Sequence, residues 1–461
     1  MSGGMSGDMS GADIGNAANA GAAGDYHARI LAAGHDPAAL ERLYREAQSA
    51  RMAGQFADAL RACYTAAPDD VLYAAWFFRL QDASEGPRVA VAGQWRVAVP
   101  ISVALGLALW ILSTPAWTVG RNVPLDLVVG GPVIAGFIIA YLALGGPRTR
   151  PVLVRAAVVG AVLAAVTIYA VAVPVPSAAN TRQTYLMLLL GHLPLLAAAA
   201  VGIALLGLRS SARDRFAFLN KALETLGTAG MAVIVGGIFV GITFAMFQAL
   251  SVTIPDLLLR LLIAGGAGLI PVLAVAAVYD PALAPDAQDF GHGFARILII
   301  LVRGLLPLSL LVLIIYIGVI PFNFTQPFVN RDVLIVYTVM LFAVLGLLVA
   351  VTPIAAGEVP ERFGRWLRIG IVAVAALAAL IGVYALVAVV YRTVQGSLTM
   401  NRLTVIGWDV VNLVVLAALL VQQARAGRGD WVAALQRAFR VGTLLYVVWG
   451  VVVVLAWPWV F

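Results

Sequence analysis

Four side chains that could carry a proton or form an ion pair fall inside long apolar stretches of this 461-residue sequence. They are Asp409, His192, Arg260 and Tyr384. At about 1.5 Å of rise per helical residue, all four would lie in the outer half of a membrane crossed by these stretches. Ionisable groups are costly in hydrocarbon and are therefore functional candidates. A buried carboxylate near a histidine and an arginine suits proton coupling or the binding of a polar headgroup, so we predict a polar site around Asp409.

Asp409 also has polar neighbours on its own predicted helix. Arg402 precedes it by seven residues and Asn412 follows it by three, so the three side chains share one helix face. Two structural explanations stay open: Asp409 could pair with an arginine and hold helices together, and His192 could bond to a neighbouring backbone carbonyl. Arg303 lies too far toward the inner side to meet Asp409, and it could extend to the inner interface.

A polar segment, residues 391–402 with the sequence YRTVQGSLTMNR, separates two of the last apolar stretches. Gly396 permits a tight turn, and Thr399 can cap the helix that begins near Asn401. Arg402 can anchor that helix at the membrane interface. A structural role and a binding role are both open for the candidate residues of this turn, which are Arg392, Gly396, Thr399 and Arg402.

This segment resembles the signature of an uncharacterised bacterial membrane family, domain of unknown function 4153. Members of that family share a Tyr-Gly-Leu-Thr-x-x-Arg turn between two late spans, with an upstream arginine. Those places are taken here by Arg392, Gly396, Leu398, Thr399 and Arg402. Gln395 stands where the signature has tyrosine, and Ser397 is an additional residue. The resemblance implies a polytopic bacterial membrane protein and supplies no activity.

The usual sequence patterns of catalytic and metal-binding sites are missing. The sequence contains no HExxH, CxxC, Gly-x-Ser-x-Gly or phosphate-binding glycine loop. Its four histidines are scattered, and Cys63 is the only cysteine, so an intrachain disulfide is impossible. We expect no metal and no cofactor, and the pattern favours a protein that is not an enzyme.

The composition is that of a membrane protein. Hydrophobic residues make up 62% of the chain and charged residues 11%, so lipid must cover part of the surface. Most of the apolar stretches reach the roughly 20 residues that a helix needs to cross a bilayer. Eleven spans are predicted, at about 97–113, 125–144, 152–175, 185–208, 226–249, 257–279, 297–320, 333–354, 369–391, 403–422 and 441–461. The predicted fold class is therefore all-α, a polytopic bundle of transmembrane helices over residues 95–461 with a small N-terminal cytoplasmic helical domain.

Basic residues between the spans fall mainly into every second gap. The even-numbered gaps hold Arg148, Arg150, Arg155, Arg209, Arg213, Arg215, Lys221, Arg296, Arg362, Arg365, Arg368, Arg425, Arg428, Arg437 and Arg440. Basic residues near span ends stay on the cytoplasmic side, which predicts a bacterial inner-membrane protein with its N-terminus in the cytoplasm and its C-terminus outside. Of the net charge of +7, residues 1–95 contribute −4 (7 − 11) and the remainder +11. The positive excess thus reflects topology, and we expect the lipid bilayer and no nucleic acid as partner.

The region before the first span has two parts. Residues 1–24 have little to bury and are expected to be disordered. They contain neither a basic start nor an apolar core, so we expect no signal peptide and a cytoplasmic N-terminal region. Residues 25–81 are expected to form a helical domain, and residues 82–94 a linker.

Three helix starts are predicted within residues 25–81. One lies at Asp36–Pro37, one near Gln55, and one at Pro68–Asp70. The segment 53–60, followed by Pro68, resembles one tetratricopeptide unit. A degenerate repeat of this kind could bind a cytoplasmic protein partner, whereas a plain three-helix domain need not.

Three functional hypotheses follow. The leading one is a permease-like or lipid-handling membrane protein with a polar site in the outer half of the bilayer, made by Asp409, His192, Arg260, Tyr384 and Asn412. The alternative is a membrane scaffold or sensor that docks a cytoplasmic partner through residues 25–81. The second alternative is a membrane-embedded transferase for lipid-linked substrates, with Asp126 as its acid or base.

Overall fold

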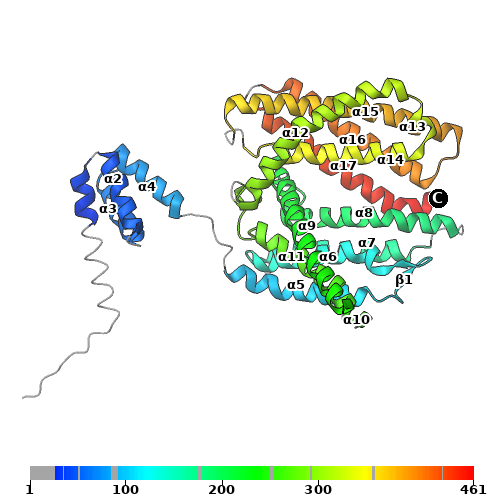
Figure 1. Cartoon of the computed structure of the whole chain (residues 1–461), viewed down its shortest axis with the longest axis horizontal. Coiled ribbons are helices and arrows are strands. Elements are labelled where there is room, and N and C mark those ends of the chain that lie inside the picture. The colour runs from blue at the N-terminus through cyan, green and yellow to red at the C-terminus, as the bar shows by residue number, and fades with distance from the viewer. Residues whose placement is uncertain are drawn as a thin grey trace, which may run out of the picture. The chain divides into compact units, whose positions relative to one another are not determined.

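The computed structural model describes residues 26–34, 36–49, 52–84, 92–174, 179–249, 254–290, 293–355, 359–427 and 429–461, and these are almost entirely helical (Figure 1). The chain divides into two compact units, residues 1–89 and residues 90–461. The predicted disordered tail, residues 1–24, lies outside the described residues, as do residues 85–91 of the predicted linker.

The first unit is a set of short helices around an aromatic core. A helix over residues 26–33 is followed by α2 (Pro37–Ser49), α3 (Ala53–Ala66) and α4 (Val71–Ser84). The predicted starts at Asp36 and Asp70 are confirmed, because these carboxylates accept hydrogen bonds from the amides of Ala38 and Leu72, both at 2.9 Å. The buried core includes Leu40, Phe56, Leu60, Cys63, Tyr73 and Trp76. Burial raises the pKa of the Cys63 thiol.

Among its described residues, the second unit contains eleven helices long and apolar enough to cross a membrane, the number of spans that the sequence predicts. Its helices are α5 (Ala92–Leu112), α6 (Leu125–Gly145), α7 (Arg150–Ala172), α8 (Ala179–Leu206), α9 (Ala212–Ala249), α10 (Asp256–Arg260), α11 (Gly266–Val278), α12 (Gly293–Val319), α13 (Gln326–Val329), α14 (Arg331–Val351), α15 (Glu361–Gln395), α16 (Met400–Arg425) and α17 (Trp431–Val460). A π-helical turn, Leu261–Gly265, joins α10 to α11, and 3-10 turns lie at Pro285–Ala287 and Ile320–Asn323. Strands β1 (Thr118–Val119) and β2 (Val123–Pro124) pair antiparallel between α5 and α6.

Several helices extend beyond their predicted apolar spans. Helix α9 begins at Ala212, well before the predicted residue 226, because its polar first turns have partners of their own. Lys221 of α9 donates a hydrogen bond to the carbonyl of Asp289, and Arg213 lies 3.6 Å from the carboxylate of Asp286. Helix α15 likewise begins at Glu361 and helix α17 at Trp431, where hydrophobicity alone does not mark the start.

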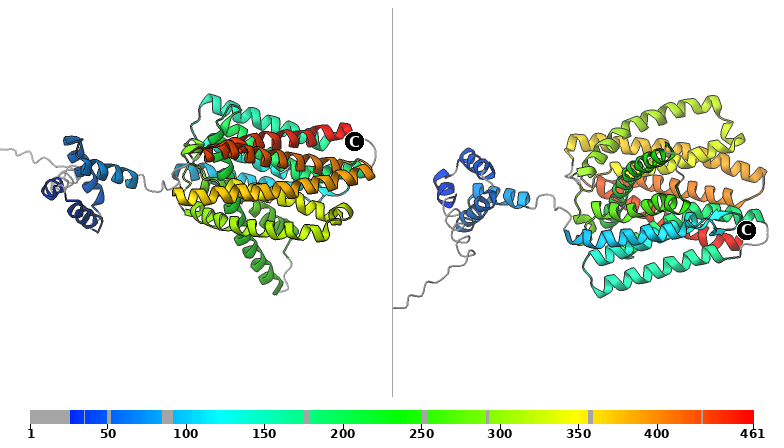
Figure 2. Two further views of the ribbon diagram at one scale, coloured as in Figure 1. Left: turned by 90° about the horizontal axis from the view of Figure 1, so that it is seen from above. Right: turned by 60° about the horizontal axis from the view of Figure 1, so that its bottom comes forward.

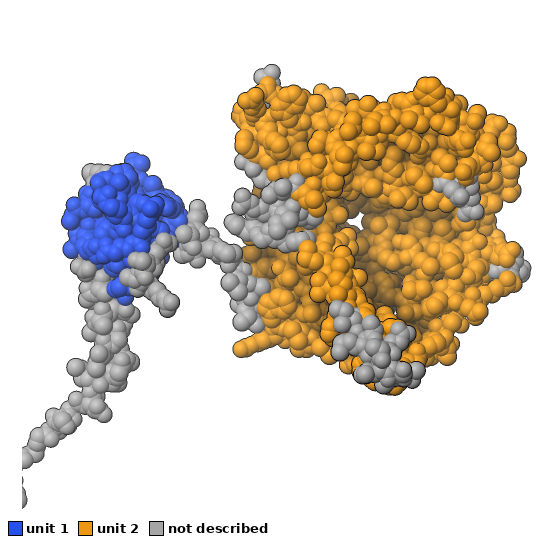
Figure 3. Space-filling view, in the orientation of Figure 1, with its two compact units in different colours: residues 1–89 blue, residues 90–461 orange. Residues whose placement is uncertain are grey.

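The membrane-type helices form two groups. Helices α5, α6, α7, α8 and α11 lie in one group, and α12, α14, α15, α16 and α17 in the other (Figures 1 and 2). Helices α8 and α17 join the groups, since the Tyr185 hydroxyl donates to the carbonyl of Val454 at 2.7 Å. Helix α9 runs obliquely across one face, and its later half projects from the bundle (Figure 2). Figure 3 shows the surface hollowed between the two groups.

Candidate functional site

A cleft of about 750 Å³ lies where the two groups of helices meet, at the end of the bundle that contains the 391–402 turn. Its polar lining comes from the start of α8, the end of α15, the turn and the start of α16, through Asn180, Thr181, Thr184, Arg392, Ser397, Thr399, Asn401 and Arg402. Its apolar lining comes from α14, α15, the turn, α16 and the last residue, through Leu334, Ile335, Val389, Leu398, Met400, Val405 and Phe461. The cleft therefore combines a polar part with an apolar wall.

The charge of the cleft is positive. Arg392 and Arg402 line it, and none of the lining side chains in the described part of the chain is a carboxylate. Arg392 donates from Nη1 to the carbonyl of Val329, and Arg402 donates from Nη1 to the carbonyl of Ser397, both at 2.7 Å. A guanidinium group has five N–H donors in a planar fork, so each arginine keeps donors for a ligand. This arrangement suits a phosphate or carboxylate group.

Two long helices begin at the cleft. The N-terminal residues of α8 and α16 are among its lining, and Thr399 caps α16 by accepting from the amide of Arg402 at 3.4 Å. The predicted cap at Thr399 is thus confirmed. Helix N-termini carry partial positive charge, which adds to the attraction that the two arginines exert on an anion.

Asp409 does not open into the cleft. Asp409 and Asn412 are both 0% exposed and lie in the core of the bundle. Thr338 of α14 lies 2.9 Å from Asp409 Oδ1, and Tyr446 of α17 donates to Asn412 Oδ1. The other atoms of these two groups, Asp409 Oδ2 and Asn412 Nδ2, have no hydrogen-bond partner within the described structure. The alternative in which Asp409 pairs with an arginine is not what the structure shows, because its contact is a threonine hydroxyl.

His192 lies against Trp408 of α16. Its Nδ1 is 2.7 Å from the carbonyl of Leu188, one turn earlier on α8, as the structural explanation from the sequence predicts. Its Nε2 accepts a hydrogen bond from the Trp408 indole at 3.0 Å. An indole N–H can only donate, so Nε2 carries no proton and the ring is neutral, with its hydrogen on Nδ1. In the sequence, nothing distinguishes Trp408 from the other apolar residues of its span, so its contact with His192 could not be predicted.

Arg260 and Tyr384 have partners elsewhere. Arg260 donates to the carbonyl of Trp110 at 2.9 Å and to the hydroxyls of Ser113 and Thr114 at 3.2 and 3.0 Å, so its bonds go to the end of α5. Tyr384 donates to the carbonyl of Phe324 at 2.7 Å. The four residues predicted to share one layer thus have four separate sets of hydrogen-bond partners.

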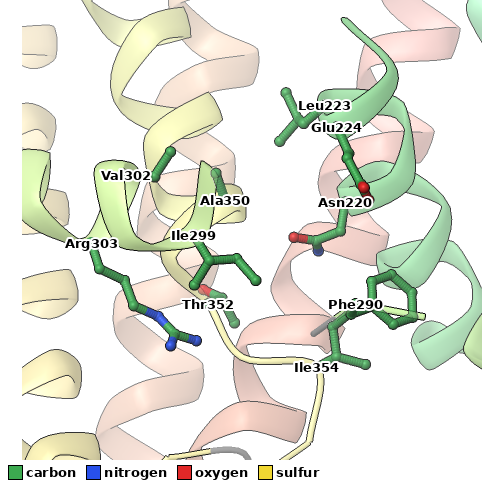
Figure 4. A pocket seen from close by; sticks show the side chains of 10 residues that line it. All are labelled: Asn220, Leu223, Glu224, Phe290, Ile299, Val302, Arg303, Ala350, Thr352 and Ile354. Atoms are coloured by element: carbon green, nitrogen blue, oxygen red, sulfur yellow. The ribbon is translucent and has the colours of Figure 1, made fainter. Parts of the chain in front are cut away.

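A second, smaller cavity of about 40 Å³ lies toward the other end of the bundle, with space for water (Figure 4). Asn220 and Glu224 of α9 form one wall and Arg303 of α12 the other, and the Arg303 side chain points away from Glu224 (Figure 4). Glu224 instead pairs with Lys221 at 2.8 Å, and both side chains are nearly buried. Within the described ranges, no group of three or more His, Cys, Asp or Glu residues could hold a metal ion.

Comparisons of this chain with protein-family models, with curated proteins and with solved structures find no match. The resemblance of the 391–402 turn to the domain of unknown function 4153 therefore stays a prediction. The helical, apolar architecture is that of an integral membrane protein.

Proposed function

We propose that this integral membrane protein is a lipid-handling protein that binds the anionic headgroup of a phospholipid in the cleft between α8 and α16. One observation carries the proposal: Arg392 and Arg402 line a cleft that has an apolar wall and no acidic side chain among its described lining residues. A phosphate fits the guanidinium groups, and acyl chains fit the wall made by residues such as Leu334 and Ile335.

The orientation of the cleft follows from the distribution of basic residues. The turns at the opposite end of the bundle carry most of the arginines, including Arg148, Arg209 and Arg425. By the positive-inside rule that end is cytoplasmic, which supports placing the cleft at the external face of a bacterial inner membrane. Its ligand then comes from the outer leaflet.

The apolar wall supports a lipid over a soluble anion. Leu398 is 54% exposed and Ile335 47% exposed, beside the arginines, in the same cleft. A small hydrophilic anion would leave this surface in contact with water, whereas an acyl chain would cover it. The proposed ligand is therefore an anionic amphiphile, and the experiment separates it from a soluble phosphate.

The test is a binding measurement on the purified full-length protein in detergent. The probes are dioctanoyl phosphatidylglycerol, the zwitterionic dioctanoyl phosphatidylcholine, and glycerol phosphate as the soluble headgroup. We expect the order of affinity phosphatidylglycerol, then glycerol phosphate, then phosphatidylcholine. Arg392→Gln and Arg402→Gln should each weaken phosphatidylglycerol binding about tenfold, since a hydrogen bond to a charged group contributes roughly 1.5–3 kcal/mol.

Arg425→Gln is the matched control, because Arg425 lies at the opposite end of the same helix α16. This variant should bind phosphatidylglycerol as the unmodified protein does. Equal binding of the two lipids, or unchanged binding by both cleft variants, would contradict the proposal. If glycerol phosphate binds as tightly as phosphatidylglycerol, the ligand is a soluble anion and not a lipid.

A further inference from the structure

Asp409 lies one helical turn beneath the floor of the cleft. Val405 of α16 lines the cleft, and Asp409 follows it by four residues on the same helix. Leu334 of α14 also lines the cleft, and Thr338 follows it by four residues. Four residues of helix rise about 6 Å. The contact between Thr338 and Asp409 therefore lies directly below the place where the anionic group is proposed to bind.

The hydrogen-bond geometry around Thr338 fits a protonated Asp409. The Thr338 hydroxyl is placed as a donor to two acceptors, Asp409 Oδ1 at 2.9 Å and the carbonyl oxygen of Leu334 at 3.3 Å. A hydroxyl has one hydrogen and can donate only once at a time. If Asp409 carries a proton, it donates to Thr338, and Thr338 donates to Leu334. Both contacts are then hydrogen bonds, whereas a carboxylate would leave one of them unmade.

Within the described residues, no positive group forms a hydrogen bond or an ion pair with Asp409. Away from their ends, the helices packed against it carry as titratable groups Tyr446 of α17, Tyr185 and His192 of α8, Tyr337 of α14 and Tyr384 of α15, and Tyr185 donates to the carbonyl of Val454. His192 is neutral, as its hydrogen bonds show. Each tyrosine is engaged elsewhere: Tyr446 donates to Asn412, Tyr384 donates to Phe324, and Tyr337 accepts from Tyr316. Two arginines of these helices, Arg392 and Arg402, lie at the level of the cleft.

We propose that Asp409 is a proton-binding site coupled to the cleft, and that the protein binds its anionic ligand together with one proton. This inference rests on the proposed function. A carboxylate one turn below the cleft repels an anion above it, and protonation removes that repulsion. The anion in turn neutralises the two arginines that would otherwise favour the carboxylate. Such coupling is reciprocal: each ligand raises the affinity for the other by the same factor.

The first test measures phosphatidylglycerol affinity against pH in the full-length protein. For the unmodified protein we expect the affinity to fall about fivefold or more as pH rises and Asp409 loses its proton. Asp409→Asn offers an amide N–H that can donate to Thr338 and cannot ionise, so it should retain the low-pH affinity at every pH. Asp126→Asn is the control, because Asp126 lies at the start of α6 and does not line the cleft. It should keep the pH dependence, and Asp409→Asn keeping it too would overturn the coupling.

The second test needs no ligand. Infrared difference spectra of the unmodified protein against pH should show the carbonyl band of a protonated carboxylic acid, shifted in heavy water. Thr338→Val should move this band by removing the hydroxyl, and Asp409→Asn should abolish it. Lack of such a band at every pH would overturn the proton site. If lipid binding fails at every pH while the band is present, the proposed function is wrong and the proton site stands.

Discussion

Gly396 lies directly beneath the guanidinium group of Arg402. A β-carbon built on Gly396 would come within 2.5 Å of Arg402 Nη1 and 3.3 Å of Nη2. The backbone at Gly396 has φ −116° and ψ −154°, a conformation open to other residues. The sequence suggested glycine for a tight turn, but the structure gives a different reason. Gly396 leaves space for the cleft arginine to lie against the turn.

Gly396→Ala should therefore weaken ligand binding without unfolding the protein. The new methyl group displaces the flexible end of Arg402, which loses its bond to the Ser397 carbonyl. We expect phosphatidylglycerol affinity to fall about tenfold, the effect of one hydrogen bond from a charged group, and the melting temperature to stay unchanged. Gly427→Ala is the control, since a β-carbon there meets nothing within 4 Å. Unchanged affinity in Gly396→Ala, with Arg402→Gln impaired, would contradict this role of the glycine.

The sequence predicts the spans well because hydrophobicity is a local property. All eleven apolar stretches become helices long enough to cross a membrane. Local capping is predicted equally well, as the side chains of Asp36 and Thr399 show. The backbone partner of His192 is also local, since Leu188 lies one turn away on the same helix. The predicted start of α9 is wrong. The helix begins earlier, at Ala212, because its polar first turns are stabilised by contacts with a loop distant in sequence, such as the hydrogen bond from Lys221 to the carbonyl of Asp289.

The depth of a residue in the membrane does not determine which neighbouring helix its side chain faces. A site predicted from depth alone can therefore include residues that do not meet. Arg260 was predicted in the layer of Asp409, but its side chain faces α5. Thr338, the actual partner of Asp409, is 71 residues away in the sequence and has no distinguishing pattern. The arginines of the cleft were among the predicted residues. The contribution of Asn180 and Thr181 depends on α8 packing beside α16, which no local pattern encodes.

Tyr446→Phe should destabilise the bundle more than Tyr384→Phe. Tyr446 donates to Asn412, which is 0% exposed and whose Nδ2 has no partner within the described structure. Without the hydroxyl the buried amide loses its remaining side-chain bond, at a cost of about 1–3 kcal/mol. Tyr384 donates to the carbonyl of Phe324, an exposed residue, so water can take the place of the lost hydroxyl as donor. Thermal unfolding in detergent, followed by circular dichroism, measures both variants. Equal melting temperatures for the pair would show that the Asn412 bond adds no stability.

The proposed orientation predicts which turns are accessible from outside the cell. In a Cys63→Ala background, which removes the only native thiol, cysteine is introduced by Ser397→Cys or by Gly429→Cys. Both positions are exposed in turns, Ser397 beside the cleft and Gly429 at the opposite end of α16. A membrane-impermeant maleimide should label the Ser397 variant in intact cells and the Gly429 variant only after the membrane is permeabilised. The reverse pattern would place the arginine-rich turns outside, against the positive-inside rule. It would also move the cleft, with its lipid and its proton, to the cytoplasmic leaflet.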